Sequence, residues 1–288
     1  MDAPGLNHAP NATDPGRSVH PETLGQGPRC RRLAGRRVLV VGAGQRASNE
    51  PAPPVGNGRA MAMLFAREGA SVACLDIVPE AAEATCRMIA GEGGHAVPIT
   101  ADVADPGAIP RAVAEAKEKL GGLDGVVLNV GISTRQKVDE LTTEDWDRVF
   151  AVNVRSNMLF AQQALRAMTP GGSIVLISSL ASQRAASRNP AYETSKAAQV
   201  ALARSIARAG EPLGIRCNSL APGLMDTPMG RDASRNRANR AALVPFGRQG
   251  TGWEVAYAAL FLISNEASYV NGHCLLVDGG LGAGISRD

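Results

Sequence analysis

Two side chains that could transfer a proton, Tyr192 and Lys196, stand four residues apart, and the hydroxyl of Ser179 comes thirteen residues before the tyrosine. A tyrosine hydroxyl ordinarily titrates at about pH 10, too high for ready proton exchange at neutral pH. Because a spacing of four places both side chains on one helix face, the Lys196 ammonium is expected to stabilise the phenolate and lower the pKa of Tyr192. Ser179 could then hold a substrate oxygen beside the phenol. Two solvated side chains on an exposed helix would show the same spacing. Whether Tyr192 and Lys196 form a proton-transfer site therefore depends on the elements that surround them.

Short β-branched runs alternate with stretches of helical periodicity through most of the chain. The expected strands cover residues 38–41, 72–75, 97–99, 126–128, 174–177, 215–220 and 275–277. The expected helices cover residues 59–68, 81–90, 109–120, 144–168, 191–209 and 253–263. Continuous apolar strands that alternate with helices predict a doubly wound α/β fold, a parallel sheet of about seven strands with helices on both faces. We expect one domain over residues 35–288, preceded by a flexible extension of residues 1–34 that is rich in Pro, Gly, Asn and His.

Charge and composition exclude several classes of partner. The net charge of +3 comes from the N-terminal end, because residues 1–37 hold six arginines and three acidic residues, which leaves 24 basic and 24 acidic residues in the remainder. A neutral domain gives no electrostatic basis for binding nucleic acid or an anionic membrane, and 3% aromatic residues supply no stacking surface for bases. The basic arm alone therefore does not indicate an RNA-binding protein.

The five cysteines are scattered and form no CxxC pair, so we expect reduced thiols and neither disulfides nor a metal site. No apolar run approaches the roughly 20 residues of a membrane span, and the N-terminus lacks the apolar segment of a secretory signal. These features predict a cytoplasmic protein that does not enter membranes.

A glycine-rich turn follows the first expected strand. Gly42-Ala43-Gly44 ends the strand, and Gly56-Asn57-Gly58 opens the next helix. Glycines let the backbone turn tightly and approach a pyrophosphate, which binds at the positive end of the helix. Asp76 ends the second strand, where a carboxylate accepts hydrogen bonds from the adenosine ribose and repels a 2′-phosphate. No arginine follows Asp76 directly, so NAD is favoured over NADP, and Arg46 in the glycine-rich turn is the residue that could reverse this preference.

The order of these and later motifs resembles that of the short-chain dehydrogenase/reductase family, over residues 36 to about 281. The later motifs are Asp102-Val103, Asn129-Val130-Gly131, Asn153, Ser179, Tyr192 with Lys196, Pro222-Gly223 with Thr227, and Val277-Asp278-Gly279-Gly280. The resemblance implies a Rossmann fold that binds a nicotinamide dinucleotide. The implied cofactor contacts are Gly42, Gly56, Asn57, Gly58, Asp76, Asp102, Val103, Asn129, Gly131, Tyr192, Lys196, Pro222, Gly223 and Thr227.

The chain departs from the family pattern in the glycine-rich turn. Val41 stands where the family usually has threonine, and Val130 stands where it usually has alanine. An insertion over residues 45–55 carries three prolines and separates the first glycine from the other two. The insertion could be a rigid surface excursion, a flap over the cofactor or a subunit contact.

The resemblance also implies catalytic roles for four residues. Tyr192 would act as general acid/base, and Lys196 would lower its pKa and bind the nicotinamide ribose. Ser179 would hydrogen-bond the substrate oxygen, and Asn153 would hold a water that links Lys196 to solvent. An intact set of four argues against a module that only senses dinucleotide. The expected function is NAD-dependent oxidation of a small or cyclic secondary alcohol, or the reverse reduction of a ketone. The alternative is a 3-oxoacyl-carrier reductase that uses NADPH.

The family places a substrate lid after the Pro222-Gly223 segment, here residues 224–250. This lid segment carries five arginines and two aspartates: Arg231, Arg235, Arg237, Arg240 and Arg248, with Asp226 and Asp232. The arginines could be the solvated face of a lid helix, or they could attract an anionic or carrier-linked substrate. The family is typically tetrameric, and the helices expected at 144–168 and 253–263 are long and apolar enough to pack between subunits, with dimer and tetramer both open.

Overall fold

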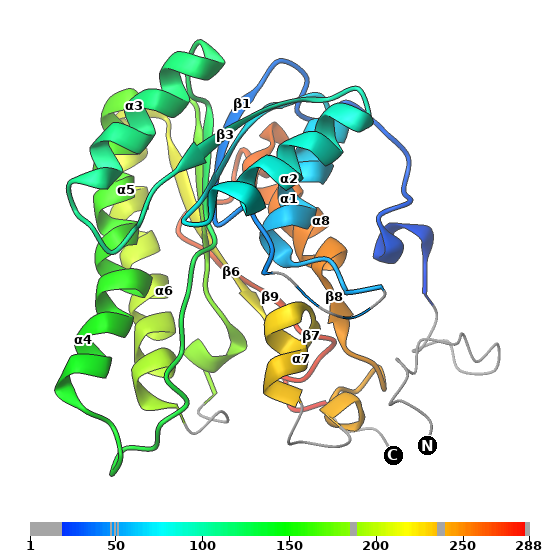
Figure 1. The fold of residues 1–288 in the computed structure, drawn as a ribbon, viewed down its shortest axis with the longest axis vertical. Helices are drawn as coiled ribbons and strands as arrows, with labels where there is room; N and C mark the ends of the chain where they lie inside the picture. Colours follow the sequence, from blue (N-terminus) through cyan, green and yellow to red (C-terminus); the bar gives the residue numbers. More distant parts are fainter. Residues whose placement is uncertain are drawn as a thin grey trace.

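Seven parallel strands form the central sheet, in the order β3-β2-β1-β4-β5-β6-β9 (Figure 1). The computed structural model describes residues 19–46, 48, 50, 52–184, 189–234 and 240–285. The strands are β1 (Arg37–Val41), β2 (Ser71–Asp76), β3 (His95–Thr100), β4 (Gly125–Leu128), β5 (Ser173–Ile177), β6 (Arg216–Pro222) and β9 (Cys274–Val277). From β1 the chain adds β2 and then β3 toward one edge of the sheet. It then crosses to β4, on the other side of β1, and adds β5, β6 and β9 toward the opposite edge. The predicted doubly wound α/β fold is confirmed.

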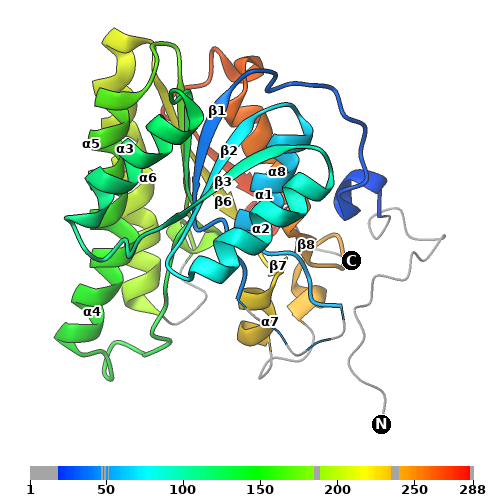
Figure 2. The ribbon, with the colours of Figure 1, turned by 45° about the horizontal axis from the view of Figure 1, so that its top comes forward.

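Two layers of helices cover the sheet (Figures 1 and 2). One layer contains α1 (Asn57–Arg67), α2 (Pro79–Gly91) and α8 (Gly252–Ile263), and the other contains α3 (Ala108–Leu120), α4 (Thr143–Phe150), α5 (Ser156–Ala167) and α6 (Pro190–Gly210). Successive residues of β1 face opposite layers: Val38 and Val40 pack into the core of the first layer, whereas Leu39 and Val41 pack into the core of the second. Burial on both faces makes each strand a continuous apolar run.

The single helix expected over residues 144–168 is interrupted in the structure. α4 gives way to a π-helical turn, η3 (Ala151–Arg155), in which the backbone N–H of Ser156 donates to the carbonyl of Ala151 five residues earlier. Such single turns occur mostly at functional sites. This one carries Asn153, whose side chain is fully buried.

Residues 19–34 pack onto the domain, although their composition predicts a flexible extension. The 3-10 helix η2 (Pro21–Leu24) contacts α8. The buried carboxylate of Glu68 accepts two backbone N–H groups of this segment, and Leu33 is fully buried. Residues 19–34 are thus held on the domain by the distant carboxylate of Glu68 and by the segment's own apolar Leu33, and the flexibility of the extension stays a prediction. The first 18 residues, also assigned to that extension, lie outside the described residues.

The lid segment follows β6 in the chain and ends shortly before α8. It contains β7 (Met225–Asp226), α7 (Pro228–Ser234) and the 3-10 helix η6 (Arg240–Leu243), and β7 pairs with β8 (Gly250–Thr251). Figure 1 shows α7 beyond the carboxyl ends of β6 and β9. Short 3-10 helices also occur at η4 (Leu180–Ser182), η5 (Glu211–Leu213) and η7 (Asn265–Ala267). None of the described helices combines the length and the apolar character needed to cross a membrane.

Candidate active site

The expected site residues gather at one edge of the sheet, because all the strands run parallel and end there. Gly42, Asp76, Asp102, Asn129, Ser179 and Pro222 lie at or just beyond the ends of β1, β2, β3, β4, β5 and β6. Open α/β sheets bind ligands at this edge, where the strand order changes direction. Here that position lies between β1 and β4.

The glycine-rich turn closes tightly despite the insertion. Gly42 has a φ of +81°, a left-handed conformation that favours glycine, and a Cβ on Gly58 would lie 1.8 Å from the Gly42 carbonyl oxygen. The Asn129 side chain donates to the same carbonyl at 2.9 Å, which ties β4 to the turn. The N–H of Gly56 donates to the side chain of Gln45 at 2.8 Å, so the two ends of the insertion are joined at its base. Gly42 and Gly58 are therefore in contact although fifteen residues separate them.

The N-terminus of α1 fits the pyrophosphate of a dinucleotide. The backbone N–H groups of a first helical turn carry partial positive charge. A Cβ on Gly56 would make only ordinary contacts, with Gln45 and Pro228, so no clash inside the chain accounts for a glycine at this position. The side-chain oxygen of Asn57 is buried there without a hydrogen-bond partner.

Asp76 lies where an adenosine ribose is expected. Its carboxylate accepts hydrogen bonds from the N–H of Gly44 at 3.0 Å and of Val78 at 3.1 Å, so its position is fixed. A Cβ on Gly44 would lie 2.5 Å from that carboxylate, which explains a glycine there. After β3, Asp102 accepts the N–H of Ala104 at 2.8 Å in an exposed turn.

The next residue along the expected adenine side, Val103, is buried. At the opposite end of the cofactor region, the N–H of Gly223 donates to the carbonyl of Val277, which joins the end of β6 to β9. Thr227 is buried, and its hydroxyl accepts the N–H of Gly230 in the first turn of α7. The lid helix therefore begins at a residue expected to contact the nicotinamide end.

The insertion contacts the lid through two ion pairs. Arg46 lies 3.1 Å from Asp232 of α7, and Glu50 is paired with Arg231 of the same helix. Of the three interpretations left open by the sequence, this contact favours a flap at the lid side of the cofactor region. It also engages Arg46, the residue that could have favoured NADP. Pro51, one of the three prolines of the insertion, lies outside the described residues.

Two lid arginines are neutralised within the chain. Arg231 pairs with Asp226 at 2.7 Å as well as with Glu50, and the buried Arg248 pairs with Glu254 at 2.7 Å. Arg240 donates to the carbonyl of Gly230. Arg235 and Arg237 lie outside the described residues. Because Arg231 and Arg248 already have carboxylate partners within the chain, these two residues give no argument for an anionic substrate.

The proton-transfer residues lie at the start of α6, against the end of β5. Ser179 ends β5, and its hydroxyl accepts the N–H of Ala181 at 3.2 Å. Burial raises the pKa of Tyr192, and a hydrogen bond with Ser179 opposes the rise. This direction differs from the expected lowering of the pKa. The physical reason is that the phenol is removed from water, which disfavours the phenolate.

Lys196 lies beneath the ring of Tyr192. Its ammonium is 5.6 Å from the ring centre and donates to the carbonyl of Ile177 at 2.8 Å and to the side-chain oxygen of Gln199 at 3.2 Å. Burial lowers the pKa of Lys196 to about 7. The group is therefore only half protonated at neutral pH, which weakens the stabilisation that it can give to a phenolate.

Asn153 binds the loop after β4. Its side-chain oxygen accepts the N–H of Ile132 at 2.8 Å, and its side-chain nitrogen donates to the Ile132 carbonyl at 3.0 Å and to the hydroxyl of Ser195 at 2.9 Å. A Cβ on Gly131 would lie 3.0 Å from the Lys196 nitrogen, so this glycine leaves room for the ammonium. The Asn153 side chain therefore orders the loop that borders Lys196.

Gln199 is the site residue that the sequence reasoning missed. It is fully buried and connects two of the expected catalytic residues: its oxygen accepts from Lys196, and its nitrogen donates to the backbone carbonyl of Asn153 at 2.7 Å. The signal that could have found it is its spacing of three from Lys196 on one helix.

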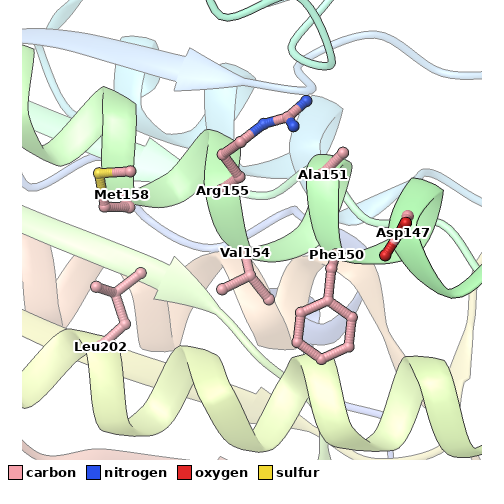
Figure 3. Close-up of a pocket in the computed structure, with 7 residues that line it drawn as sticks. All are labelled: Asp147, Phe150, Ala151, Val154, Arg155, Met158 and Leu202. Carbon is pink, nitrogen blue, oxygen red and sulfur yellow. The ribbon is translucent and has the colours of Figure 1, made fainter.

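A separate apolar groove lies on the outer surface of the helices, away from this edge of the sheet. It has a volume of about 500 Å³ between η3 and its flanking helices and α6. Phe150 and Val154 point toward α6, from which Leu202 comes; Asp147 lies at one end of the drawn residues, and Arg155 points away from α6 (Figure 3). The expected catalytic side chains do not line this groove.

Fold and site define an oxidoreductase of the type that binds a nicotinamide dinucleotide at the edge of a doubly wound sheet. Residues 54–282 match the family model described as enoyl-(acyl carrier protein) reductase. The chain is 38% identical to a 2-(R)-hydroxypropyl-CoM dehydrogenase of Xanthobacter autotrophicus, over 78% of this chain and 93% of that protein. It is 34% identical to a 3-oxoacyl-[acyl-carrier-protein] reductase of Thermotoga maritima, over 87% of this chain and 99% of that protein.

The fold agrees with these matches. A solved short-chain dehydrogenase/reductase of Serratia marcescens superposes with a TM-score of 0.80 at 34% identity, covering 87% of this chain and 99% of that structure. The chain belongs to the short-chain dehydrogenase/reductase family.

Proposed function

We propose that this protein is an NAD-dependent oxidoreductase that interconverts a secondary alcohol and a ketone. The observation that carries the proposal is the grouping of Ser179, just beyond the end of β5, with Tyr192 at the start of α6, where the Lys196 ammonium lies 5.6 Å from the Tyr192 ring centre. A half-buried phenol can give and take a proton, and a second hydroxyl beside it can hydrogen-bond the same substrate oxygen. Similarity to a hydroxypropyl dehydrogenase supports a secondary alcohol as the substrate class.

Each residue then has one task in the proton step. Ser179 donates a hydrogen bond to the substrate oxygen and stabilises the charge that develops on it. Tyr192 takes the alcohol proton during oxidation and returns a proton to the carbonyl oxygen during reduction. Protonated Lys196 stabilises the phenolate that forms, and Asn153 holds the loop beside it. A bound nicotinamide ring supplies or accepts the hydride.

The preference for NAD rests on Asp76. Its carboxylate is fixed by two backbone N–H groups, and a 2′-phosphate beside it would meet a negative charge. Arg46, which could have balanced that charge, is paired with Asp232. Fluorescence titration should therefore give tighter binding of NADH than of NADPH, and Asp76→Ser should reduce that difference. Tighter binding of NADPH to the unaltered enzyme would contradict the assignment.

The proton step is tested with Tyr192→Phe, which removes the hydroxyl and keeps the ring. Turnover of secondary alcohols should fall at least about a hundredfold, the usual contribution of general acid–base catalysis, while NADH binding is retained. Tyr269→Phe is the matched control, since that side chain is fully exposed. A Tyr192→Phe enzyme that turned over like the control would exclude the assigned role.

A carrier-linked ketoreduction with NADPH is the second candidate. The description of the family model and the 3-oxoacyl reductase relative favour it, whereas Asp76 and the internal pairing of Arg231 and Arg248 do not. Assays with a 3-oxoacyl thioester and NADPH, run beside a panel of secondary alcohols with NAD, separate the two functions.

We also propose that two copies of the chain pack across the groove of Figure 3. Apolar Phe150, Val154 and Leu202 line this groove, and an apolar surface of this kind can be covered by the same surface of a second copy. Light scattering should give a dimer or tetramer, and Val154→Lys should yield a smaller species. A monomeric wild type would contradict this pairing.

The free state of all five cysteines supports a cytoplasmic location.

A further inference from the structure

The carboxamide of Gln199 bridges two parts of the site that come from different elements. It lies on α6, three residues after Lys196, and none of its side chain is exposed. The oxygen accepts from the Lys196 ammonium at 3.2 Å, and the nitrogen donates to the Asn153 carbonyl in η3 at 2.7 Å. A chain of contacts therefore runs from Lys196 through one side chain to the π-helical turn.

The orientation of this carboxamide is fixed by its two neighbours. The ammonium can only donate, and the Asn153 carbonyl can only accept. Turning the amide over would place its NH2 group against the ammonium and its oxygen against the carbonyl, so both contacts would become repulsive. Because the side chain is buried, no solvent would compensate for that loss.

We propose that Gln199 is a positioning residue for the proton step: its oxygen favours the protonated form of Lys196 beside Tyr192, and its contact with the Asn153 carbonyl holds that oxygen in place. This inference rests on the proposed function. The amide joins Lys196 to the carbonyl of Asn153, whereas the water expected to link Lys196 to solvent stays a prediction. An amide cannot relay a proton as readily as water, so Gln199 acts on the charge of Lys196 and not as a conduit.

The surroundings of Lys196 give this one contact a large effect. The groups that face the ammonium are the Ile177 carbonyl from β5, Gly131 from the loop after β4, and Tyr192 and Gln199 from α6. Among them Tyr192 is the one titratable group, and burial is the cause that lowers the pKa of Lys196 to about 7. With no carboxylate among these neighbours, two neutral oxygens are the acceptors that favour the charged form.

The proposal is tested by the titration of Lys196 itself. The chain has four lysines, so protein labelled with carbon-13 at the lysine side chain gives four signals, and the Lys196 signal is identified by its absence in Lys196→Met. Gln199→Leu removes both contacts at nearly constant volume and should lower the Lys196 midpoint by about one pH unit, the scale of one hydrogen bond to a charged group. Gln199→Glu places a carboxylate beside the ammonium and should raise the midpoint.

Gln163→Leu is the matched control, because Gln163 is a half-buried amide of α5 to which the structure gives no hydrogen bond with Lys196 or Asn153. Its Lys196 midpoint should equal that of the wild type. If Gln199→Leu and Gln199→Glu both leave the midpoint where the control has it, the inference is wrong. If Gln199→Leu fails to fold, the Gln199→Glu titration decides alone.

The rate profile links the titration to catalysis. In Gln199→Leu, fewer ammonium groups face Tyr192, so the acid limb of kcat/KM for alcohol oxidation should move upward on the pH axis. A purely structural role would lower the thermal midpoint and the rate at every pH without moving this limb. The Lys196 midpoint is read without turnover, so it still judges Gln199 if Tyr192→Phe were to overturn the proposed function.

Discussion

Replacing Lys196 with methionine should stabilise the fold at neutral pH while it removes activity. The lysine is almost fully buried, and the pKa of its ammonium falls from 10.5 to about 7 on folding. Since one pKa unit corresponds to about 1.4 kcal/mol, the charged form is disfavoured in the folded state by about 5 kcal/mol. Methionine has a similar length and no charge, so it escapes this cost.

The sign of the pH dependence follows from the protons bound. Between pH 7 and 10.5 the unfolded lysine is protonated and the folded one is not, so the stability of the wild type rises with pH across this window. At pH 7 this difference in proton binding makes the folded wild type about 4 kcal/mol less stable than it would be with an unshifted Lys196 pKa. Lys196→Met leaves the Ile177 and Gln199 oxygens without a donor, which costs roughly 2–3 kcal/mol in total. The variant should therefore be about 1–2 kcal/mol more stable than the wild type at pH 7 and less stable above about pH 9.

Urea unfolding followed by circular dichroism at pH 6, 7, 8 and 9 measures this difference directly. Lys119→Met is the matched control, because Lys119 is 41% exposed and paired with Glu115, so its difference from the wild type should stay flat. The difference for Lys196→Met should instead shrink by about 1 kcal/mol per pH unit above neutrality. A difference that stayed constant, or grew with pH, would refute the argument that Lys196 is held partly neutral by burial.

Further expectations concern the turn, the N-terminal segment and the reaction itself. Gly58→Ala places a Cβ 1.8 Å from the Gly42 carbonyl oxygen and should destabilise the protein by about 3 kcal/mol and weaken NADH binding, whereas Gly91→Ala, with nothing within 4 Å, should be neutral or slightly stabilising in urea unfolding. Deleting residues 1–34 uncovers the surface under Leu33 and leaves the buried Glu68 carboxylate without its backbone donors, so the thermal midpoint should fall by roughly 5–10 °C relative to deletion of residues 1–18; an equal midpoint would show that the segment contributes nothing. The raised pKa of Tyr192 should place the optimum for alcohol oxidation above that for ketone reduction on the pH axis, and coincident optima would argue against Tyr192 as the acid/base.

The sequence was sufficient to predict the parallel sheet and the helices on its two faces. Strands buried on both faces must be apolar throughout, so runs such as 38–41 and 174–177 are recognisable, and the structure extends each by one residue at its start. The break at η3 was not recognisable, because residues 151–155 keep the apolar spacing of the helices on either side. Packing of residues 19–34 depends on Glu68, whose role appears only in the folded chain.

The site was predictable where a residue's position in the chain fixes its place in the sheet. Asp76 and Ser179 end strands, so a parallel sheet brings them to one edge. The contact between Gln199 and the Asn153 carbonyl was not predictable, because it needs a turn of η3 to face α6. The direction of the Tyr192 pKa was not predictable either, since the spacing to Lys196 indicates proximity but gives no measure of burial.

Removal from water affects both proton-transfer groups, the half-buried Tyr192 and the buried Lys196. Desolvation raises the pKa of Tyr192 and lowers that of Lys196. Both shifts favour the neutral form of the group, so the pair as a whole is pushed toward a state without charge. A site in this state holds a phenol ready to donate, which suits reduction of a carbonyl, whereas oxidation requires that Lys196 be charged when the phenolate forms. Any group that favours the ammonium therefore makes the phenolate easier to form. The two oxygens that do so are the Ile177 carbonyl, which is part of the sheet and cannot vary, and the Gln199 side chain, which can. In the proposed mechanism, the charge of Lys196 and the ease of forming the phenolate thus depend on a residue that touches neither the substrate oxygen nor Tyr192.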